Sequence, residues 1–259
     1  MSYTEKYRPQ SLAECLYPDQ ATKDVIRDFA ANSMDSSLVL YGPMGTGKSL
    51  MAKLIADELS ERRAAWSETF QGTVLQTSSK SDAAVERIER ISHLICPVDR
   101  WLFIIEEFDR IKLDRQMAFS YLMDKADMQL ILTTNEVHDI DKRILSRAHV
   151  CHISGATQED MLTLAQHVVA SEGVTATQAE LEKLTVSSAG NVRDLMRGLE
   201  GLVLRKRRQA VQTVASQVTL PSGVTAAMAQ SGPTAASIHN VVPAVSLIPP
   251  NMPVVQPTP

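Results

Sequence analysis

The eight residues from Gly42 to Ser49 carry the spacing that most clearly implies chemistry. In order they are Gly42, Pro43, Met44, Gly45, Thr46, Gly47, Lys48 and Ser49. Glycines at these positions let the backbone curl so that successive N–H groups face phosphate oxygens. Lys48 would supply a positive charge to the β- and γ-phosphates, and the Ser49 hydroxyl would be a ligand for Mg²⁺. The segment therefore predicts a site for ATP with Mg²⁺.

Two adjacent carboxylates follow an apolar segment further along the chain. Glu106 and Glu107 come directly after Leu102–Ile105, which is typical of a buried strand. Such a strand delivers acids to the carboxyl edge of a parallel sheet, where ligands of α/β folds bind. Glu106 would then hold the Mg²⁺ shell, and Glu107 would polarise an attacking water. The alternative is a strand that simply ends in solvated acids.

A third polar group stands at the end of another apolar segment. Asn135 comes two positions after Leu130–Thr133, with Thr134 between them. From the strand beside the phosphate loop, its amide would orient water or sense the γ-phosphate. Asparagine is also a common turn former, so this position by itself leaves both interpretations open.

The elements that must position these groups alternate between strand and helix over residues 1–154. Continuous apolar segments predict strands covered on both faces, hence a parallel sheet between helices in a three-layer α/β fold. The helical segments expected here are Leu50–Leu59 and Asp82–Leu94. The expected strands are Ser37–Tyr41, Thr73–Gln76, Leu102–Ile105, Leu130–Thr133 and Val150–Ile153.

The rest of the chain divides into two further regions. Residues 155–207 predict a small all-α lid domain with helices over Thr157–Ala170, Gln178–Ser187 and Val192–Arg207. Residues 208–259 hold eight of the twelve prolines and no Lys, Arg, Asp or Glu after Arg208. This composition predicts a disordered tail, with docking on a partner through Val241–Val255 as the alternative.

Composition excludes several classes of protein. The net charge of −4 gives no general attraction to nucleic acid, so any DNA contact would need a local basic patch. Three widely spaced cysteines form no CxxC pair, which argues against a disulfide framework or a zinc module. The polar N-terminus and the lack of a long apolar segment lead us to expect a cytoplasmic protein.

The opening segment resembles one family in particular. Glu5-Lys6-Tyr7-Arg8-Pro9 is similar to the start of AAA+ ATPases of the clamp-loader group, which includes replication factor C small subunits and T4-type phage clamp-loader ATPase subunits. The resemblance implies that Tyr7, Arg8 and Pro9 line the adenine pocket. The segment from Glu106 to Arg110 resembles the phage Asp-Glu-Phe-Asp-Arg motif, which suggests a phage or plasmid origin. It implies that Glu107 is the catalytic glutamate and Asn135 is sensor 1.

Two arginines acquire roles from the same resemblance. Arg147, in Leu145–Ala148, resembles the arginine finger that completes the site of a neighbouring subunit. An ordinary surface arginine is the alternative. Arg193 lies in a segment that resembles the sensor 2 helix start, so it would contact phosphates of its own subunit. A purely structural arginine is the alternative there.

The resemblance also has two departures. Family members carry Asp where this chain has Glu106, and the longer side chain would slow hydrolysis or alter metal preference. Nothing after Arg208 resembles the helical collar that holds such pentamers together.

The partners implied are neighbouring AAA+ subunits, a sliding clamp and primer–template DNA. DNA phosphates would meet basic side chains at helical spacing, unless these form a solvated, ion-paired surface. A further basic cluster, Arg205–Arg208, would be a second nucleic-acid patch or the cationic end of a helix. The candidate DNA contacts are Lys80, Arg87, Arg90, Arg110, Lys112 and Arg115.

Taken together, the sequence predicts an ATP-driven subunit that loads a sliding clamp on DNA during replication. One alternative is another DNA-remodelling AAA+ ATPase, from recombination or from phage or plasmid replication. The other is a scaffold that binds ATP with little turnover, which the glutamate at position 106 keeps open.

Overall fold

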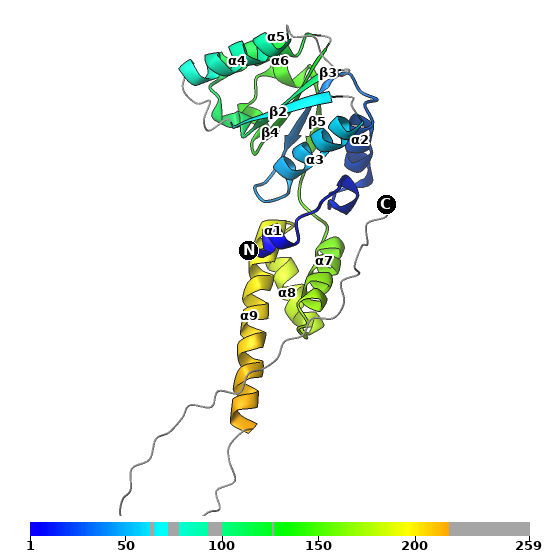
Figure 1. Ribbon diagram of the computed structural model, residues 1–259, viewed down its shortest axis with the longest axis vertical. Coiled ribbons are helices and arrows are strands. Elements are labelled where there is room, and N and C mark those ends of the chain that lie inside the picture. Colours follow the sequence, from blue (N-terminus) through cyan, green and yellow to red (C-terminus); the bar gives the residue numbers. More distant parts are fainter. Residues whose placement is uncertain (63–64, 72–77, 93–99, 126, 218–259) are drawn as a thin grey trace, which may run out of the picture. The chain divides into compact units, whose positions relative to one another are not determined.

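The computed structural model describes residues 1–62, 65–71, 78–92, 100–125 and 127–217 (Figure 1). The chain divides into two units, Met1–Gln217 and Val218–Pro259. The expected tail from residue 218 onward lies outside the described residues.

A five-stranded parallel sheet forms the centre of the first unit, as predicted. The strand order is β2-β3-β4-β1-β5, and every neighbouring pair is parallel. This order brings the carboxyl ends of β1, β3 and β4 side by side at one edge. The strands are β1 (Ser37–Tyr41), β2 (Ala65–Gln71), β3 (Arg100–Glu106), β4 (Met128–Thr134) and β5 (Ala148–His152).

Strand β2 differs from expectation. The expected strand Thr73–Gln76 lies outside the described residues, and the strand that the structure contains ends before it, at Gln71. It pairs with β3 at the edge of the sheet. Its sequence is mostly polar, with Ser67, Glu68 and Thr69 in succession, and so gives no continuous apolar signal.

Both faces of the sheet are covered by helices. Leu38 and Leu40 of β1 pack in a core with α2 (Gln20–Ala30) and α3 (Lys48–Glu61). Val39, between them, points to the opposite core. This alternation explains why the middle of each central strand is apolar at successive positions. The opposite core is covered by α4 (Ser78–Ser92), α5 (Leu113–Leu122) and α6 (Lys142–Leu145). Short 3₁₀ turns occupy Leu12–Glu14, Phe108–Arg110 and Val137–Asp139.

Three helices follow the sheet, in the region where the sequence predicts a small all-α lid; this region is called the lid below. They are α7 (Gln158–Ser171), α8 (Gln178–Ser188) and α9 (Val192–Gln217). Thr157 caps α7, and Thr177 with Glu180 forms a full capping box on α8. Their apolar faces share a core of their own.

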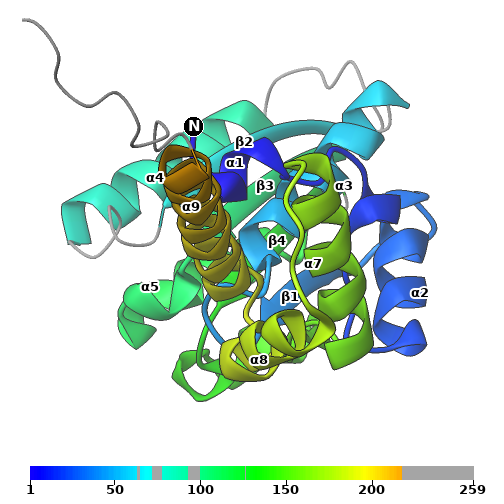
Figure 2. The ribbon, with the colours of Figure 1, turned by 90° about the horizontal axis from the view of Figure 1, so that it is seen from below.

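The N-terminal helix α1 (Tyr3–Lys6) belongs to the lid by its contacts. Tyr3 and Tyr7 pack against the lid core rather than against the sheet. Figures 1 and 2 both show α1 beside the first turns of α9. The segment that opens the chain therefore packs against the last helix of the described residues.

Helix α9 continues to Gln217, ten residues beyond the expected end at Arg207. The boundary placed at residue 208 is therefore wrong, because residues 208–217 are helical. The loss of charge after Arg208 does not end a helix, and the first proline beyond it is Pro221. The cluster Arg205–Arg208 lies inside the helix. It is therefore not the cationic C-terminal end of a helix, which was one of its two interpretations.

Within the described residues, no helix combines the length and the apolar character needed to cross a bilayer.

Candidate nucleotide site

The loop between β1 and α3 requires glycine at positions where a side chain would collide. A Cβ on Gly42 would lie 2.3 Å from the Ile153 carbonyl oxygen, and one on Gly45 would lie 2.1 Å from Asn191 Oδ1. Both residues also have positive φ, as does Gly47, which caps the start of α3. The loop thus passes against β5 on one side and against the lid on the other, with its backbone turned toward the start of α3.

Lys48 is the buried cation of this loop, with only 7% of its surface exposed. Its Nζ donates hydrogen bonds to the carbonyls of Gly42 and Pro43, both at 2.7 Å, and to Asn135 Oδ1 at 3.1 Å. Burial is the main cause that lowers the pKa of Lys48 to about 8; Asp109 opposes this shift, and Arg193 adds to it. Lys48 therefore joins the loop to the tip of β4.

Two adjoining cavities lie beside the loop. The first has a volume of about 280 Å³ and the second about 400 Å³. Tyr7, Arg8 and Pro9 line both, so the opening segment of the chain forms a wall common to the two. Predicted site residues that line the first cavity are Met44, Gly45, Gly47, Lys48, Ser49, Glu107, Asn135 and Arg193.

The two cavities differ in chemistry. The first gathers the charged and polar groups of the loop, β3, β4 and α9. The second is lined mainly by apolar side chains; its polar and charged lining residues are Arg8, Glu14, Thr46 and His167. A polar end beside an apolar end suits a molecule with phosphates at one end and a planar base at the other. Gly42 and Pro43 line a third hollow on the β5 side instead.

Glu107 reaches the first cavity from a strained backbone. Its φ of 54° and ψ of 49° lie in the left-handed region, which non-glycine residues rarely adopt. The Glu107 N–H donates to Thr133 Oγ1 at 3.2 Å, which ties this turn to β4. Strain of this kind, about 1 kcal/mol or more, persists where the surroundings hold it in place.

Glu106 has a different environment from the one the sequence predicts. Its side chain is buried at the end of β3, and its carboxylate forms an ion pair with Lys53 of α3 at 2.8 Å. The other oxygen accepts a hydrogen bond from the Gln71 amide at the end of β2. Glu106 is not among the residues that line the described cavities. The residues that fit a Mg²⁺ ion in the first cavity are Ser49 and Glu107.

Arg147 is not brought into the cavities of its own chain. Its guanidinium forms a two-pronged ion pair with Asp124, at 2.6 Å from Nε and 3.2 Å from Nη2. Its Nη1 donates to the Arg143 carbonyl. This pairing lowers the pKa of the Asp124 carboxyl. The two predicted arginines therefore separate, with Arg193 at the first cavity and Arg147 elsewhere on the surface.

The candidate DNA contacts are partly engaged within the chain. Arg87 pairs with Glu68 at 2.7 Å, and Arg115 pairs with Asp82 at 2.9 Å. The side chains of Lys80, Arg90, Arg110 and Lys112 are exposed. In the α9 cluster, Lys206 pairs with Glu180 and Arg207 with Glu172. Ion pairing thus accounts for part of each basic patch.

Several lining residues were not predicted from the sequence. Thr133 and Thr134 stand at the end of β4, next to the predicted Asn135, and their position at the sheet edge is a usable signal. His167 and Met196 come from lid helices and give none, because a polar or apolar residue on a helix is equally consistent with packing.

With this geometry established, comparison with known proteins defines the class. Residues 38–154 match the family described as "ATPase family associated with various cellular activities (AAA)". Solved structures of the RuvB Holliday junction branch migration motor of Thermotoga maritima superpose with a TM-score of 0.58. The identity is 19%, over 81% of this chain and 67% of that chain. At this identity the likeness supports the fold. Residues 38–154 are therefore similar to an ATP-hydrolysing domain of the AAA type, in agreement with the prediction.

Curated relatives narrow the similarity to the group expected from the opening segment. Replication factor C small subunit 1 of Pyrobaculum arsenaticum is 27% identical over 224 residues, covering 83% of this chain and 66% of the relative. Small subunit 2 of Pyrobaculum islandicum is 26% identical and covered to 62%. The large subunit of Thermococcus kodakarensis is 24% identical over 84% of this chain and is covered to 43%. The chain therefore spans about two thirds or less of these relatives, and its similarity to clamp-loader-group ATPases is confirmed.

Proposed function

We propose that the chain is an ATPase subunit of a clamp-loader-type assembly that opens a sliding clamp and places it on primer–template DNA. The similarity to replication factor C small and large subunits over most of the chain supports this proposal. ATP would lie across the two cavities, with its phosphates at the loop and its base against Tyr7 and Pro9.

Each residue has a role that follows from its place. Lys48 and Arg193 supply positive charge to the phosphates, since both line the first cavity. Asn135, which accepts a hydrogen bond from Lys48, orients the attacking water. Glu107 accepts the proton of that water. A bound Mg²⁺ would neutralise charge on the phosphates, held by Ser49 with Glu107 nearby.

The position of Arg147 is the observation that favours an assembly over a single subunit. It does not line the described cavities of its own chain, and it is paired with Asp124 at an exposed position. An arginine finger acting on a neighbour has such a location, since its target lies on another subunit. We propose that Arg147 leaves Asp124 for the γ-phosphate of the adjacent subunit.

The candidate DNA contacts would act in the same assembly. Lys80, Arg90, Arg110 and Lys112 are exposed and come from α4 and from the turn before α5. Repeated around several subunits, such side chains would follow a phosphate backbone without reading bases.

One observation favours a second candidate, a nucleotide-dependent scaffold with little turnover. Glu106 is the first of the two adjacent acids, and its ion pair with Lys53 holds it outside the first cavity. If this pairing persists when ATP and Mg²⁺ bind, one expected ligand of the metal shell is missing.

A steady-state ATPase assay separates these functions. The purified chain would be measured alone, with primed DNA, with a sliding clamp, and with both together. Stimulation by DNA and clamp together supports clamp loading, and stimulation by DNA alone supports a different DNA-remodelling ATPase. Binding of ATP without turnover in any mixture supports the scaffold and contradicts the proposal.

A further inference from the structure

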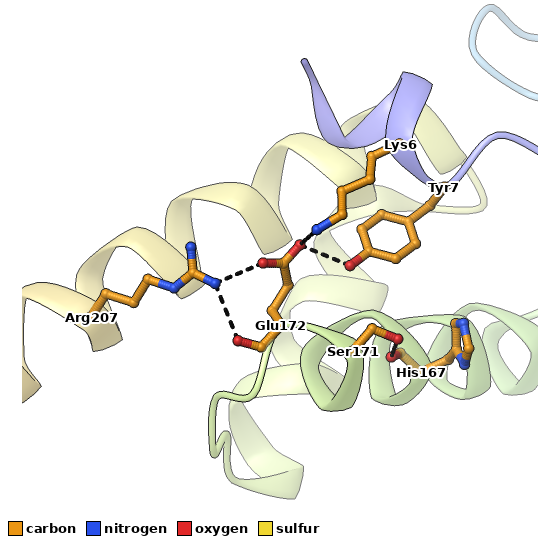
Figure 3. A network of polar contacts seen from close by, with 6 residues as sticks. All are labelled: Lys6, Tyr7, His167, Ser171, Glu172 and Arg207. Carbon is orange, nitrogen blue, oxygen red and sulfur yellow. Dashed lines mark hydrogen bonds and ion pairs between the residues drawn. The ribbon is translucent and has the colours of Figure 1, made fainter. Parts of the chain in front are cut away.

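One carboxylate of the lid receives contacts from both ends of the described chain. Glu172 stands at the end of α7, and only 4% of its side chain is exposed. Figure 3 shows the side chains that converge on it, from α1 on one side and from α9 on the other. Lys6 of α1 lies 166 positions before Glu172 in the sequence, and Arg207 of α9 lies 35 positions after it.

The contacts of Glu172 are short and directional. Lys6 Nζ donates to Oε1 at 2.6 Å, and the Tyr7 hydroxyl donates to the same oxygen at 2.8 Å. Arg207 Nη2 donates to Oε2 at 2.8 Å and to the Glu172 carbonyl at 3.1 Å. Charge-assisted hydrogen bonds of this length are among the strongest that side chains make.

The position of Glu172 has no evident benefit for its own helix. A carboxylate at a helix C-terminus faces the negative end of the helix dipole, which disfavours it. The hydrogen bonds from Lys6 and Tyr7 nevertheless lower the pKa of Glu172 to about 2, so it is charged at any working pH. The stabilising partners come from α1 and α9, which indicates that the carboxylate serves the link between those elements.

That link connects walls of the two cavities. Tyr7 lines both, and its ring also packs edge-on toward His167 of α7, with centroids 6.5 Å apart. The first turns of α9 contribute Val192 and Met196 to both cavities. Glu172 therefore joins the N-terminal wall, the α7 wall and the α9 wall through one side chain.

We propose that Glu172 is a positioning residue for the nucleotide, which fixes the Tyr3–Pro9 segment as the wall of the base-side cavity. This inference rests on the proposed nucleotide site, and it concerns the base rather than the phosphates. Glu172 lines neither described cavity, so it acts through Tyr7 and Lys6.

The test compares two ligands that share phosphates and differ in the base. Glu172→Gln keeps the size of the side chain but removes the charge that three donors share. We expect its affinity for ATP to fall about tenfold, which corresponds to about 1.4 kcal/mol, with unchanged affinity for inorganic tripolyphosphate. Both dissociation constants would be measured by calorimetry on the full chain.

Glu180→Gln is the matched control. Glu180 is also a lid glutamate with a lysine partner, Lys206 at 2.8 Å, and a pKa lowered to about 2, chiefly by that lysine. It lines neither described cavity, and glutamine preserves its capping box. We expect this variant to bind both ligands as the wild type does.

A second variant keeps the test valid if Glu172→Gln fails to fold. Lys6→Met changes a side chain that is half exposed, and it should reduce ATP affinity selectively, by a smaller factor. Equal losses for ATP and tripolyphosphate, or wild-type ATP affinity in both variants, would overturn the inference alone. Wild-type protein that binds neither ligand would overturn the proposed function as well.

Discussion

The loop at the edge of the sheet and the lid differ in how their residues contribute to folding stability. At the loop, a lysine is buried, a glutamate has a left-handed backbone, and two acids stand side by side at the end of β3. In the lid, α7 and α8 begin with threonine caps, and Glu172 and Glu180 pair with basic residues of α9. At the loop, features that cost folding free energy lie where phosphate chemistry is proposed, whereas the caps and ion pairs of the lid stabilise its helices.

The largest effect should come from Lys48. Lys48→Ala removes a buried cation that reaches both the loop carbonyls and Asn135. We expect loss of ATP and tripolyphosphate binding, to below detection by calorimetry. An alanine variant that still binds ATP within tenfold of the wild type would contradict this contrast between loop and lid. The free-energy cost of burying Lys48 would then have no counterpart in ligand binding.

Arg147 should affect turnover without affecting binding. Arg147→Ala retains every residue of its own cavities, so ATP affinity should be unchanged while hydrolysis falls about a thousandfold. A steady-state phosphate-release assay measures this.

Mixing variants tests whether Arg147 acts on a neighbour. Glu107→Gln removes the proposed base but keeps the arginine, so a mixture with Arg147→Ala contains interfaces in which both groups are intact. Partial recovery of hydrolysis in the mixture is expected. Full activity of Arg147→Ala alone would remove the proposed role.

The pH dependence of ATP binding should be moderate and should follow Lys48. With its pKa lowered to about 8, Lys48 loses charge as pH rises through that value, and ATP affinity should fall about tenfold between pH 7 and pH 9. The ordinary value of 10.5 applies to the unfolded chain, which therefore binds more protons between about 8 and 10.5. In this window Lys48 contributes rising folding stability while binding weakens.

Calorimetric titrations of ATP at several pH values check this prediction. In Lys48→Arg the charge persists across the range, so whatever affinity remains should not vary with pH. A flat profile for the wild type would show that the burial of Lys48 does not limit phosphate binding.

The smallest effect concerns the lid alone. Thr177→Ala removes the hydroxyl that caps α8 and should lower the free energy of unfolding by about 1 kcal/mol, as measured with denaturant. Thr177→Ser retains the cap and should be close to the wild type. ATP affinity should be unchanged in both, and a marked loss of affinity would mean that the two regions are not independent.

The parts of the site that could be predicted are those whose signal is local. The glycines and lysine of the loop are contiguous, and the edge residues Glu107 and Asn135 each follow an apolar strand. The sheet was predicted apart from the edge strand β2, whose mostly polar sequence gives no continuous apolar signal. Residues whose contact partners lie far away in the sequence gave no such signal.

Glu106 and Glu172 show why the rest could not be predicted. The environment of Glu106 depends on Lys53, half a helix beyond the loop, and on Gln71 of β2. The contacts of Glu172 depend on α1 and on a stretch of α9 that was expected to lie at the end of the lid. Each is a tertiary contact that leaves no periodicity or motif in the sequence.

Helix α9 has a mechanical consequence that follows from its length. It spans 26 residues, and its first turn contributes Val192 and Arg193 to the first cavity. At 1.5 Å per residue, Gln217 lies about 37 Å along the axis from Val192, so a tilt of about 5° at the cavity would displace it by about 3 Å. A small change of angle beside the first cavity would therefore become a displacement of side-chain dimensions at the far end of the helix.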